Sequence, residues 1–597
     1  MALDVVKAVQ NYINKFLADV HGMKVLLLDK DTTPIVSLVL TQSHLLSREV
    51  YLVDRIDASS GSSSSSSSAS ASAASKDPLK HLKCVAFLRP TPESVQALVD
   101  ELREPRYSEY YLYFSNTLPK SSLERLAESD VQSLVREVHE HFADFYSVNA
   151  DLFHLGLAPP SSPWGDVPGA WRGDALQRTA QGVCAVMLGL KKRCVVRYER
   201  DSAVGKKLAQ EIGYLISQDP SLFDFRAPPV PPLLLILDRR SDPVTPLLTQ
   251  WTYQAMVHEL MGITNGRVDM SGVPGVRDEM KEAILSADQD PFYKRNMYLD
   301  LGELGANIKT YVDEYQTKHK SSVAIESISD MKRFVEEYPE FRKLAGNVTK
   351  HVTIVGELSR LVERGRLLEV GELEQNLAAT ENHAQDLRTL QQILENPTVS
   401  EDNKVRLVIL YALRYEKSAG NATQQLLEQL ARNKVPNKKI ALVNAMLTFA
   451  GADSRQSDIF HNDSLLAKSR TLFKGLKGVD NVYTQHQPHL VGVVDELIKG
   501  RLKEQMYPFL EGGMRDKPQD IIIFIVGGAT YAEARAVTQL NATTPGVRIV
   551  LGGTFIHNSR SFLRDVSETV TRWEASGTSS AKFASPKMHT ARVNKMS

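Results

Sequence analysis

The sequence predicts an α/β protein with parallel-sheet domains, one of which is discontinuous because a mostly α-helical domain is inserted into it. Two observations lead to this fold class. Aliphatic runs at 233–237 and 520–526 are typical of strands buried on both faces, and helical patterns follow them. Between about residues 250 and 476, helical patterns dominate instead. We therefore expect C-terminal strands to complete a sheet that begins before this helical region.

The first 146 residues are expected to form the first α/β domain. They begin with an amphipathic helix over 3–20, which carries apolar residues on one face. Aliphatic and aromatic runs predict strands at 23–28, 35–40, 49–53, 83–88 and 110–114. Helical patterns cover 91–101 and about 130–145. Residues 58–75 are almost pure serine and alanine, which cannot bury enough apolar surface to fold, so we expect a disordered loop there.

The rest of the chain is expected to form two further domains and a tail. The second α/β domain is expected in two pieces, at 147–249 and 480–573. The mostly α third domain lies between them, at 250–479. Residues 574–597 are polar and rich in serine, threonine and lysine, so we expect a disordered tail.

The composition excludes several classes of protein. Lys+Arg and Asp+Glu are both 71, which argues against a general polyanion binder, and we expect no nucleic-acid partner. The cysteines, Cys84, Cys184 and Cys194, form no C-x-x-C pattern and resemble reduced core residues of an intracellular protein. No stretch approaches the ~20 apolar residues of a membrane span. We therefore expect a cytosolic protein that reaches membranes only through its partners.

The most informative run of the chain follows the aliphatic strand at 233–237. Asp238, Arg239, Arg240 and Asp242 lie in the turn where this strand ends. Open α/β sheets often place ligand chemistry at such turns. The alternative is structural, because these charges can satisfy one another and the following helix by hydrogen bonds. We interpret the run as a structural strand-turn-helix junction.

A helix is expected to follow this turn. Thr245 suits the N-cap position and Pro246 the first helical position. Apolar residues between 248 and 261 then recur at the spacing of a half-buried helix.

One pattern supports an enzyme as the alternative function. Asp29 and Asp31 fit the strand-end D-x-D-x-T pattern of Mg²⁺-dependent haloacid-dehalogenase-type phosphatases, in which the first aspartate attacks phosphorus. Asp238 and Asp242 could supply the acid pair that holds Mg²⁺. The competing interpretation is that Asp29 and Asp31 cap a turn by accepting backbone N–H bonds.

Other candidate sites are weaker. Gly527-Gly528 follows an apolar strand but lacks both phosphate-binding signatures, so a tight strand-to-helix turn is favoured. The histidine pairs 139/141 and 486/489 have no convergent cysteine or carboxylate ligands. We therefore predict no catalytic residue, no metal site and no cofactor.

The runs LLILDRRSDPVTPL at 234–247 and QWTYQAMVHEL at 250–260 closely resemble the Sec/Munc (SM) family of syntaxin-binding regulators of SNARE-mediated membrane fusion. VVKAVQNYIN at 5–14 and GMKVLLLDK at 22–30 are similar to the branch of that family that serves trans-Golgi and endosomal traffic. The resemblance covers essentially the whole chain apart from the serine tract and the last ~25 residues, a far more specific match than a five-residue pattern.

The resemblance implies a three-domain arch without enzymatic activity. It implies a syntaxin-type Qa-SNARE as partner (syntaxin-16-like), bound through its N-terminal peptide and its helical bundle, and an assembling SNARE complex that includes an R-SNARE. A monomer, peripherally associated with Golgi and endosomal membranes, is expected.

The resemblance also places a small apolar pocket for the syntaxin N-terminal peptide on the first domain, between Phe114 and His141. The apolar candidates are Leu123, Leu126, Leu134, Val135 and Val138. Glu140 is a candidate partner for a basic residue of the peptide. The competing interpretation is that some of these side chains only bury a helix against its own sheet.

A second syntaxin contact is implied in the cavity between the first and third domains. In the third domain, residues 307–361 correspond to a helical hairpin that can extend to template SNARE pairing, with its tip at 321–329. Pro339 matches a hinge proline of that hairpin, and proline removes a helix hydrogen bond. An ordinary interhelical turn at Tyr338-Pro339-Glu340 fits equally well.

Overall fold

The computed structural model describes residues 3–57, 79–159, 161–323, 328–456, 459–460, 483 and 485–577, and side chains for all of these except 318–343. The predicted serine-rich loop at 58–75 lies outside the described residues, as does the tail from 578 onward. Residues 574 and 575, expected in the tail, instead end the last helix, α20 (Ser559–Ala575).

The N-terminal domain is built on a five-stranded parallel sheet, which we call the first sheet. Its strand order is β2-β1-β3-β4-β5, so that β2 and β5 are its two edges. The strands are β1 (Lys24–Leu28), β2 (Val50–Arg55), β3 (Leu79–Leu88), β4 (Tyr107–Phe114) and β5 (Val135–Glu140). All five side chains of β1 are buried, as its aliphatic sequence predicts for a strand with helices on both faces.

Helices cover both faces of the first sheet. They are α1 (Val5–Asp19), α2 (Thr32–Val39), α3 (Gln42–Ser47), α4 (Pro92–Arg103) and α5 (Lys120–Ser129). Phe16 of α1 packs against Phe87 and Tyr113 on one face. The opposite face forms a separate core with apolar residues of α4 and α5, among them Leu98 and Leu126.

Two predicted elements of this domain are wrong. Residues 35–40 were expected as a strand but lie mainly in α2, because the side chain of Asp29 turns the chain and Pro34 fits a first helical turn. The helix expected over about 130–145 is replaced by edge strand β5. An irregularity in its pairing with β4 breaks the alternation of side chains, so that apolar residues recur at a helix-like spacing.

The second sheet has six strands in the order β6-β7-β13-β12-β9-β8, parallel except for the antiparallel pair β6–β7. Its strands are β6 (Tyr146–Asn149), β7 (Leu152–His154), β8 (Val195–Tyr198), β9 (Leu233–Asp238), β12 (Asp520–Val526) and β13 (Arg548–Gly553). Because β12 pairs with β9 on one side and β13 on the other, the C-terminal part of the chain completes the sheet. The expected discontinuous α/β domain is confirmed.

The helices around the second sheet are α6 (Ala175–Gly189), α7 (Ala203–Gln218), α18 (His489–Ile498) and α19 (Tyr531–Thr543), together with the short 3-10 helices η1 (Pro220–Phe223), η2 (Arg239–Ser241) and η3 (Thr245–Leu247). The helical pattern predicted after the aliphatic run at 520–526 corresponds to α19.

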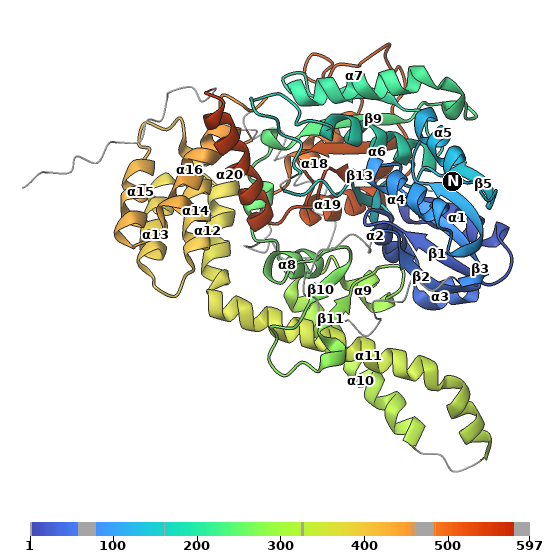
Figure 1. Ribbon diagram of the computed structural model, residues 1–597. Helices are drawn as coiled ribbons and strands as arrows, with labels where there is room; N and C mark the ends of the chain where they lie inside the picture. The colour runs from blue at the N-terminus through green and yellow to red at the C-terminus, as the bar shows by residue number, and fades with distance from the viewer. Residues whose placement is uncertain are drawn as a thin grey trace, which may run out of the picture.

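The inserted region is mostly helical, as predicted. It opens with α8 (Tyr253–Leu260), the strand pair β10 (Arg267–Asp269) and β11 (Glu282–Ile284), η4 (Asp278–Met280) between them, and α9 (Pro291–Asn296). Helices α10 (Leu301–Val323) and α11 (Ile328–Gly365) pack together and project from the rest of the molecule (Figure 1).

A helical bundle completes the insertion. Its helices are α12 (Leu367–Ala379), α13 (His383–Glu395), α14 (Glu401–Tyr415), α15 (Thr423–Arg432) and α16 (Asn437–Ala450). The C-terminal α20 packs against α16, where Trp573 stacks on Phe449 at 5.9 Å between ring centroids (Figure 1). None of the helices in the described part of the chain is both long and apolar enough to span a membrane.

Candidate partner-binding surfaces

The charged turn after β9 is filled by buried ion pairs. Arg239 donates two hydrogen bonds to the carboxylate of Glu533, of 3.0 and 2.7 Å, and both side chains are buried. Glu533 is also the third residue of α19, where it completes a capping box with Thr530. The pair therefore joins the end of β9 to the first turn of α19.

The two aspartates of this turn are also paired. Asp238 accepts hydrogen bonds from Ser202 Oγ at 2.7 Å and from Arg240 Nη2 at 2.8 Å. Burial raises the pKa of Asp238, but Arg240 and these hydrogen bonds outweigh burial and hold the pKa below its usual value. For Asp242, Arg239 and Thr245 likewise outweigh burial and lower the pKa to about 2.

The helix expected directly after this turn begins later than predicted. Asp238 caps the short 3-10 helix η2 (Arg239–Ser241), and Asp242 accepts from the backbone N of Thr245, which starts η3 (Thr245–Leu247). Thr245 is thus the first residue of a 3-10 turn rather than an α-helical N-cap, and α8 begins only at Tyr253. The aspartates serve these turns instead of the α-helix, and the role of the junction as purely structural stays our proposal.

Both carboxylate oxygens of Asp29 accept hydrogen bonds from the protein itself. Its Oδ1 accepts from the backbone N of Asp31 at 3.0 Å and of Thr32 at 2.7 Å, and its Oδ2 accepts from Arg89 N and Ser94 Oγ, both at 2.8 Å. The side chain is buried, so these donors leave no open position for an incoming phosphate.

The proposed acid pair for Mg²⁺ also belongs to another domain. Asp238 and Asp242 follow β9 of the second sheet, whereas Asp29 follows β1 of the first. The phosphatase alternative is therefore not supported. Among the described residues, no group of three or more His, Cys, Asp or Glu side chains could hold a metal ion.

The Gly527-Gly528 turn is shaped by its surroundings. Both residues have φ near +90°, and a Cβ atom would collide with Trp164 at Gly527 and with His557 at Gly528. The N-terminus of α19 is already capped by Glu533, which accepts from Thr530 N at 2.9 Å. The turn is a close approach of backbone to packed rings, and no phosphate is needed to explain it.

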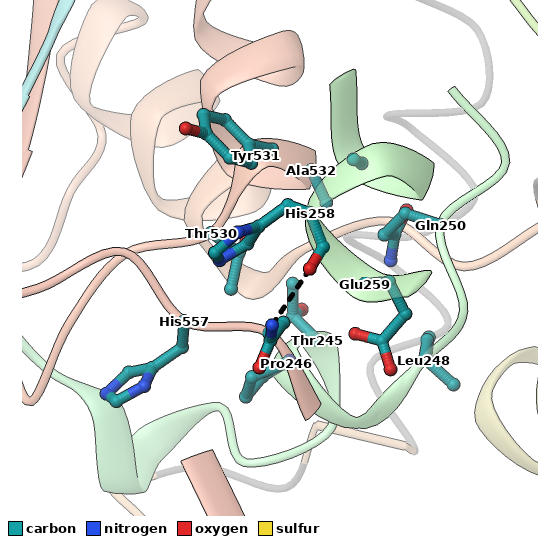
Figure 2. A pocket seen from close by; sticks show the side chains of 12 residues that line it. Thr245, Pro246, Leu248, Gln250, His258, Glu259, Thr530, Tyr531, Ala532 and His557 are labelled. Atoms are coloured by element: carbon teal, nitrogen blue, oxygen red, sulfur yellow. Dashed lines mark hydrogen bonds between the residues drawn. The ribbon is translucent and has the colours of Figure 1, made fainter. Parts of the chain in front are cut away.

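A small cavity lies beside this turn, between α8, α19 and the start of α20 (Figure 2). His258 and His557 line it, and Asn558 Nδ2 donates to the carbonyl of His258 at 2.9 Å. Its volume of about 20 Å³ holds about one water molecule. It is far too small for a substrate or cofactor.

The predicted peptide pocket lies where α5 faces edge strand β5, a region we call the α5–β5 surface. In the β4–β5 ladder, Val135 pairs with Tyr110 and Val138 with Leu112. Paired residues of parallel strands share a face, so both valines lie on the face that α5 covers. The structure thus brings the predicted residues of β5 and α5 to one side of the sheet.

Burial separates these residues into two sets. Leu126 is only 3% exposed and belongs to the core, and Leu134 and Val135 pack against that core. Leu123 and Val138 are 43% and 39% exposed, and Glu140 is also exposed. Leu123 and Val138 therefore remain as apolar anchors that solvent can reach.

One residue of this surface was missed at the level of sequence. Val131, in the loop between α5 and β5, is 83% exposed, the highest value among the large exposed apolar side chains described. The sequence placed it at the start of the helix predicted over about 130–145, which the structure replaces with a loop and β5. Three exposed apolar side chains thus lie on α5, on β5 and on the loop between them, which is unusual for a solvated edge.

The opposite edge of the first sheet carries a second exposed apolar group, which we call the β2–α3 patch. It consists of Met23, Leu46, Tyr51, Leu52 and Val53, each between 39% and 66% exposed. It spans both faces of the edge, because Leu52 and Val53 pair with Val25 and Leu26 on opposite faces of the sheet. Sequence reasoning treated β2 as an ordinary strand, because its edge position depends on the strand order and not on its own residues.

The α10–α11 hairpin covers the residues that the sequence assigned to a helical hairpin. Helix α11 includes position 339 without an interruption of the helix, while 324–327, within the predicted tip, lie outside the described residues. The hinge role of Pro339 stays a prediction.

A model of the Sec1 family matches residues 24–565 of the chain. The chain belongs to the Sec1 family. It is 50% identical over 568 residues to mouse vacuolar protein sorting-associated protein 45, covering 94% of this chain and 96% of that protein. It is 45% identical to the fission yeast protein of the same name (Schizosaccharomyces pombe), covering 96% of this chain and all of that protein.

A solved structure with the same fold is described as the SM protein Vps45 in complex with the Qa-SNARE Tlg2. Its TM-score to this chain is 0.88 at 51% identity, covering 96% of this chain and 99% of that one. The three-domain SM architecture expected from the sequence is thereby confirmed. Membership of the Sec1 family also confirms the expected class of protein, a non-enzymatic regulator of SNARE-mediated traffic.

Proposed function

We propose that this Sec1-family protein binds a syntaxin-type Qa-SNARE, of the syntaxin-16 type, and promotes its assembly with an R-SNARE. The observation that supports this most strongly is the likeness, over nearly the whole chain, to a Vps45 solved with the Qa-SNARE Tlg2. The protein would act in trans-Golgi, endosomal and vacuolar traffic. It would be held at those membranes by the partner.

The α5–β5 surface would take the N-terminal peptide of the syntaxin. Leu123, Val131 and Val138 offer apolar contacts to an inserted side chain, and burying each anchor is worth roughly 1–3 kcal/mol. A basic residue of the peptide would pair with Glu140, which lies at the end of β5 and accepts from Leu118 N at 2.7 Å. That hydrogen bond holds the carboxylate at the rim of the surface.

The β2–α3 patch would contact the helical bundle of the same syntaxin. It lies on the edge of the first sheet opposite to β5, so a peptide and a bundle could bind at the same time without competing. Exposed apolar groups of this kind are typical of protein interaction sites. Helices α10 and α11 would template SNARE pairing, with Pro339 as the hinge of the hairpin.

Calorimetric titration with a synthetic syntaxin N-terminal peptide tests the α5–β5 surface. Leu123→Arg and Val138→Arg should each weaken binding at least tenfold, because a charge then replaces an apolar anchor. Val167→Arg is the matched control, since Val167 is equally exposed but lies in the segment between β7 and α6, outside the α5–β5 surface. An affinity unchanged in both arginine variants, with intact circular dichroism, would reject the assignment.

A further inference from the structure

One turn contacts both the N-terminal domain and the base of the α10–α11 hairpin. This turn, which we call the 286–290 turn, is closed by the hydrogen bond from Asp290 N to Ser286 O, of 3.0 Å. It lies between β11 and α9, and α9 lies between α2 and the hairpin (Figure 1). Its two aspartates contact different domains.

Asp288 contacts the N-terminal domain. The side-chain amide of Gln10, on α1, donates to Asp288 Oδ2 at 2.9 Å and to the carbonyl of Val39, at the end of α2, at 3.0 Å. Leu38 of α2 also packs so closely on Gly266 that a side chain there would displace it. Leu285, which directly precedes the 286–290 turn, donates its backbone N–H to the carbonyl of Gly266 at 2.8 Å. The contact of Leu38 with Gly266 is therefore also linked to the turn.

Asp290 contacts the hairpin. Its Oδ1 caps α9 by accepting from Phe292 N and Tyr293 N. Its Oδ2 accepts from Lys350 Nζ at 2.5 Å and from His351 Nε2 at 2.8 Å, both on α11. One carboxylate therefore holds two helices at a set distance from each other.

His351 extends this contact into the core. It is fully buried, and its Nδ1 lies 2.7 Å from the hydroxyl of Tyr253 on α8. Since a carboxylate can only accept, Nε2 carries the proton toward Asp290, and Nδ1 accepts from Tyr253. Helix α11 is thus anchored to both α8 and α9 through one imidazole.

We infer that the 286–290 turn couples the position of the N-terminal domain to the stability of the α11 base. Asp288 and Asp290 are two residues apart in a closed turn. A displacement of α1 and α2 that moves Asp288 therefore also moves Asp290, which binds His351 and Lys350. The functional consequence rests on the proposed function, in which α11 is half of the SNARE template. A Qa-SNARE bound to the N-terminal domain would then alter that template, and the coupling would act equally in both directions.

Hydrogen exchange measured by mass spectrometry on the full chain without a partner tests the coupling. Gln10→Met keeps the side chain at nearly the same size but removes the amide N–H groups that bond Val39 O and Asp288 Oδ2. It should raise the exchange rate of the α11 amides of residues 348–358 about two- to tenfold, the effect of losing the one hydrogen bond to the turn. Lys7→Met, also on α1 but with its ammonium near only Asp4, should leave these amides unchanged.

Asp290→Asn is the positive control, because it directly weakens the contact between the turn and α11 and should raise the exchange of these amides. If Asp290→Asn raises their exchange while Gln10→Met alters only α1, α2 and the turn, the coupling is refuted. If Asp290→Asn fails to fold, the comparison of Gln10→Met with Lys7→Met still decides. The proposed function can fail independently, because no SNARE is present in this measurement.

Discussion

At the scale of single residues, the pair of Arg239 and Glu533 depends strongly on its geometry, because both charges are buried. Two charges removed from water cost several kcal/mol each, and only close, doubly hydrogen-bonded geometry offsets that cost. The distances of 3.0 and 2.7 Å meet this requirement. Burial lowers the pKa of Arg239, but Glu533 and Asp242 outweigh it and raise that pKa above its usual value.

Glu533→Gln should therefore lower the free energy of unfolding of the second-sheet domain by about 3 kcal/mol, because it leaves the Arg239 guanidinium buried beside a neutral partner. The melting temperature, followed by differential scanning fluorimetry, reports this loss. Glu369→Gln is the matched control, since it breaks a solvent-exposed pair with Arg366 that is worth about 0–1 kcal/mol. Equal melting temperatures for the two variants would contradict the argument.

At the scale of elements, the sequence predicted most buried strands and most long helices. Strands β1, β3, β4, β9 and β12 correspond to runs of aliphatic or aromatic residues, a pattern typical of buried strands. β5 and α2 were missed because local pattern competed with tertiary context. An edge strand with irregular pairing copies the spacing of a helix, and a β-branched run that follows a capped turn can still be helical.

The same limit applies to the candidate site. The residues predicted for the peptide pocket lie on the α5–β5 surface, but the sequence could not divide core from surface, because Leu123 and Leu126 are both leucines one helical turn apart. The β2–α3 patch could not be predicted at all. Its exposure follows from strand order, which is decided by pairing with segments far away in the chain.

Leu123 and Leu126 provide a test of this division. Leu126→Ala should lower the free energy of unfolding by about 2–4 kcal/mol, since it leaves a cavity in the core beneath α5. Leu123→Ala should change stability by less than about 1 kcal/mol and yet weaken peptide binding. Thermal melting and calorimetry on both variants provide the comparison. A large loss of stability in Leu123→Ala would place it in the core instead.

At the scale of the whole molecule, buried ion pairs fill the space beyond the carboxyl ends of the strands in both sheets, and in the first sheet they also join two domains. In open α/β folds, ligands bind beyond the carboxyl ends of the parallel strands. Beyond β3 and β4, Arg89 and Asn116 meet Asp144, which also pairs with Arg178 of α6 at 3.2 Å. Beyond β9 and β12, the equivalent space holds Arg239 and Glu533. In both sheets, buried charged side chains therefore occupy the position where other open α/β folds bind ligands.

Three buried histidines beside the second sheet predict that the stability of the protein depends on pH. Burial lowers the pKa of His154 and His557 to about 3 and that of His258 to about 4. The unfolded chain therefore binds protons first as pH falls below about 6.5, and each histidine costs up to about 1.4 kcal/mol per pH unit. Buried Glu199, whose pKa is raised to about 8 by burial and Asp238, offsets one of the three.

The melting temperature should thus fall steadily between pH 6.5 and pH 5, because the three histidines outweigh Glu199 and Asp565, the latter with a pKa raised to about 6 by burial. Fluorimetric melting in buffers of constant ionic strength measures this decline. A His557→Gln variant that folds should show a shallower slope than the parent protein. A melting temperature that rises toward pH 5 would overturn the prediction.

The late arrival of β12 has a consequence for how the protein is made. Strand β9 ends at Asp238, and its neighbour β12 begins only at Asp520, so ~280 residues separate two strands that lie side by side. A ribosome that adds about 5–20 residues per second needs roughly 15–60 s to bridge this gap. Throughout that time β9, made almost wholly of leucine and isoleucine, has no strand on one flank. Biosynthesis of the chain should therefore depend on chaperones that shield this edge, and truncation before Asp520 should yield aggregates instead of a shorter folded protein.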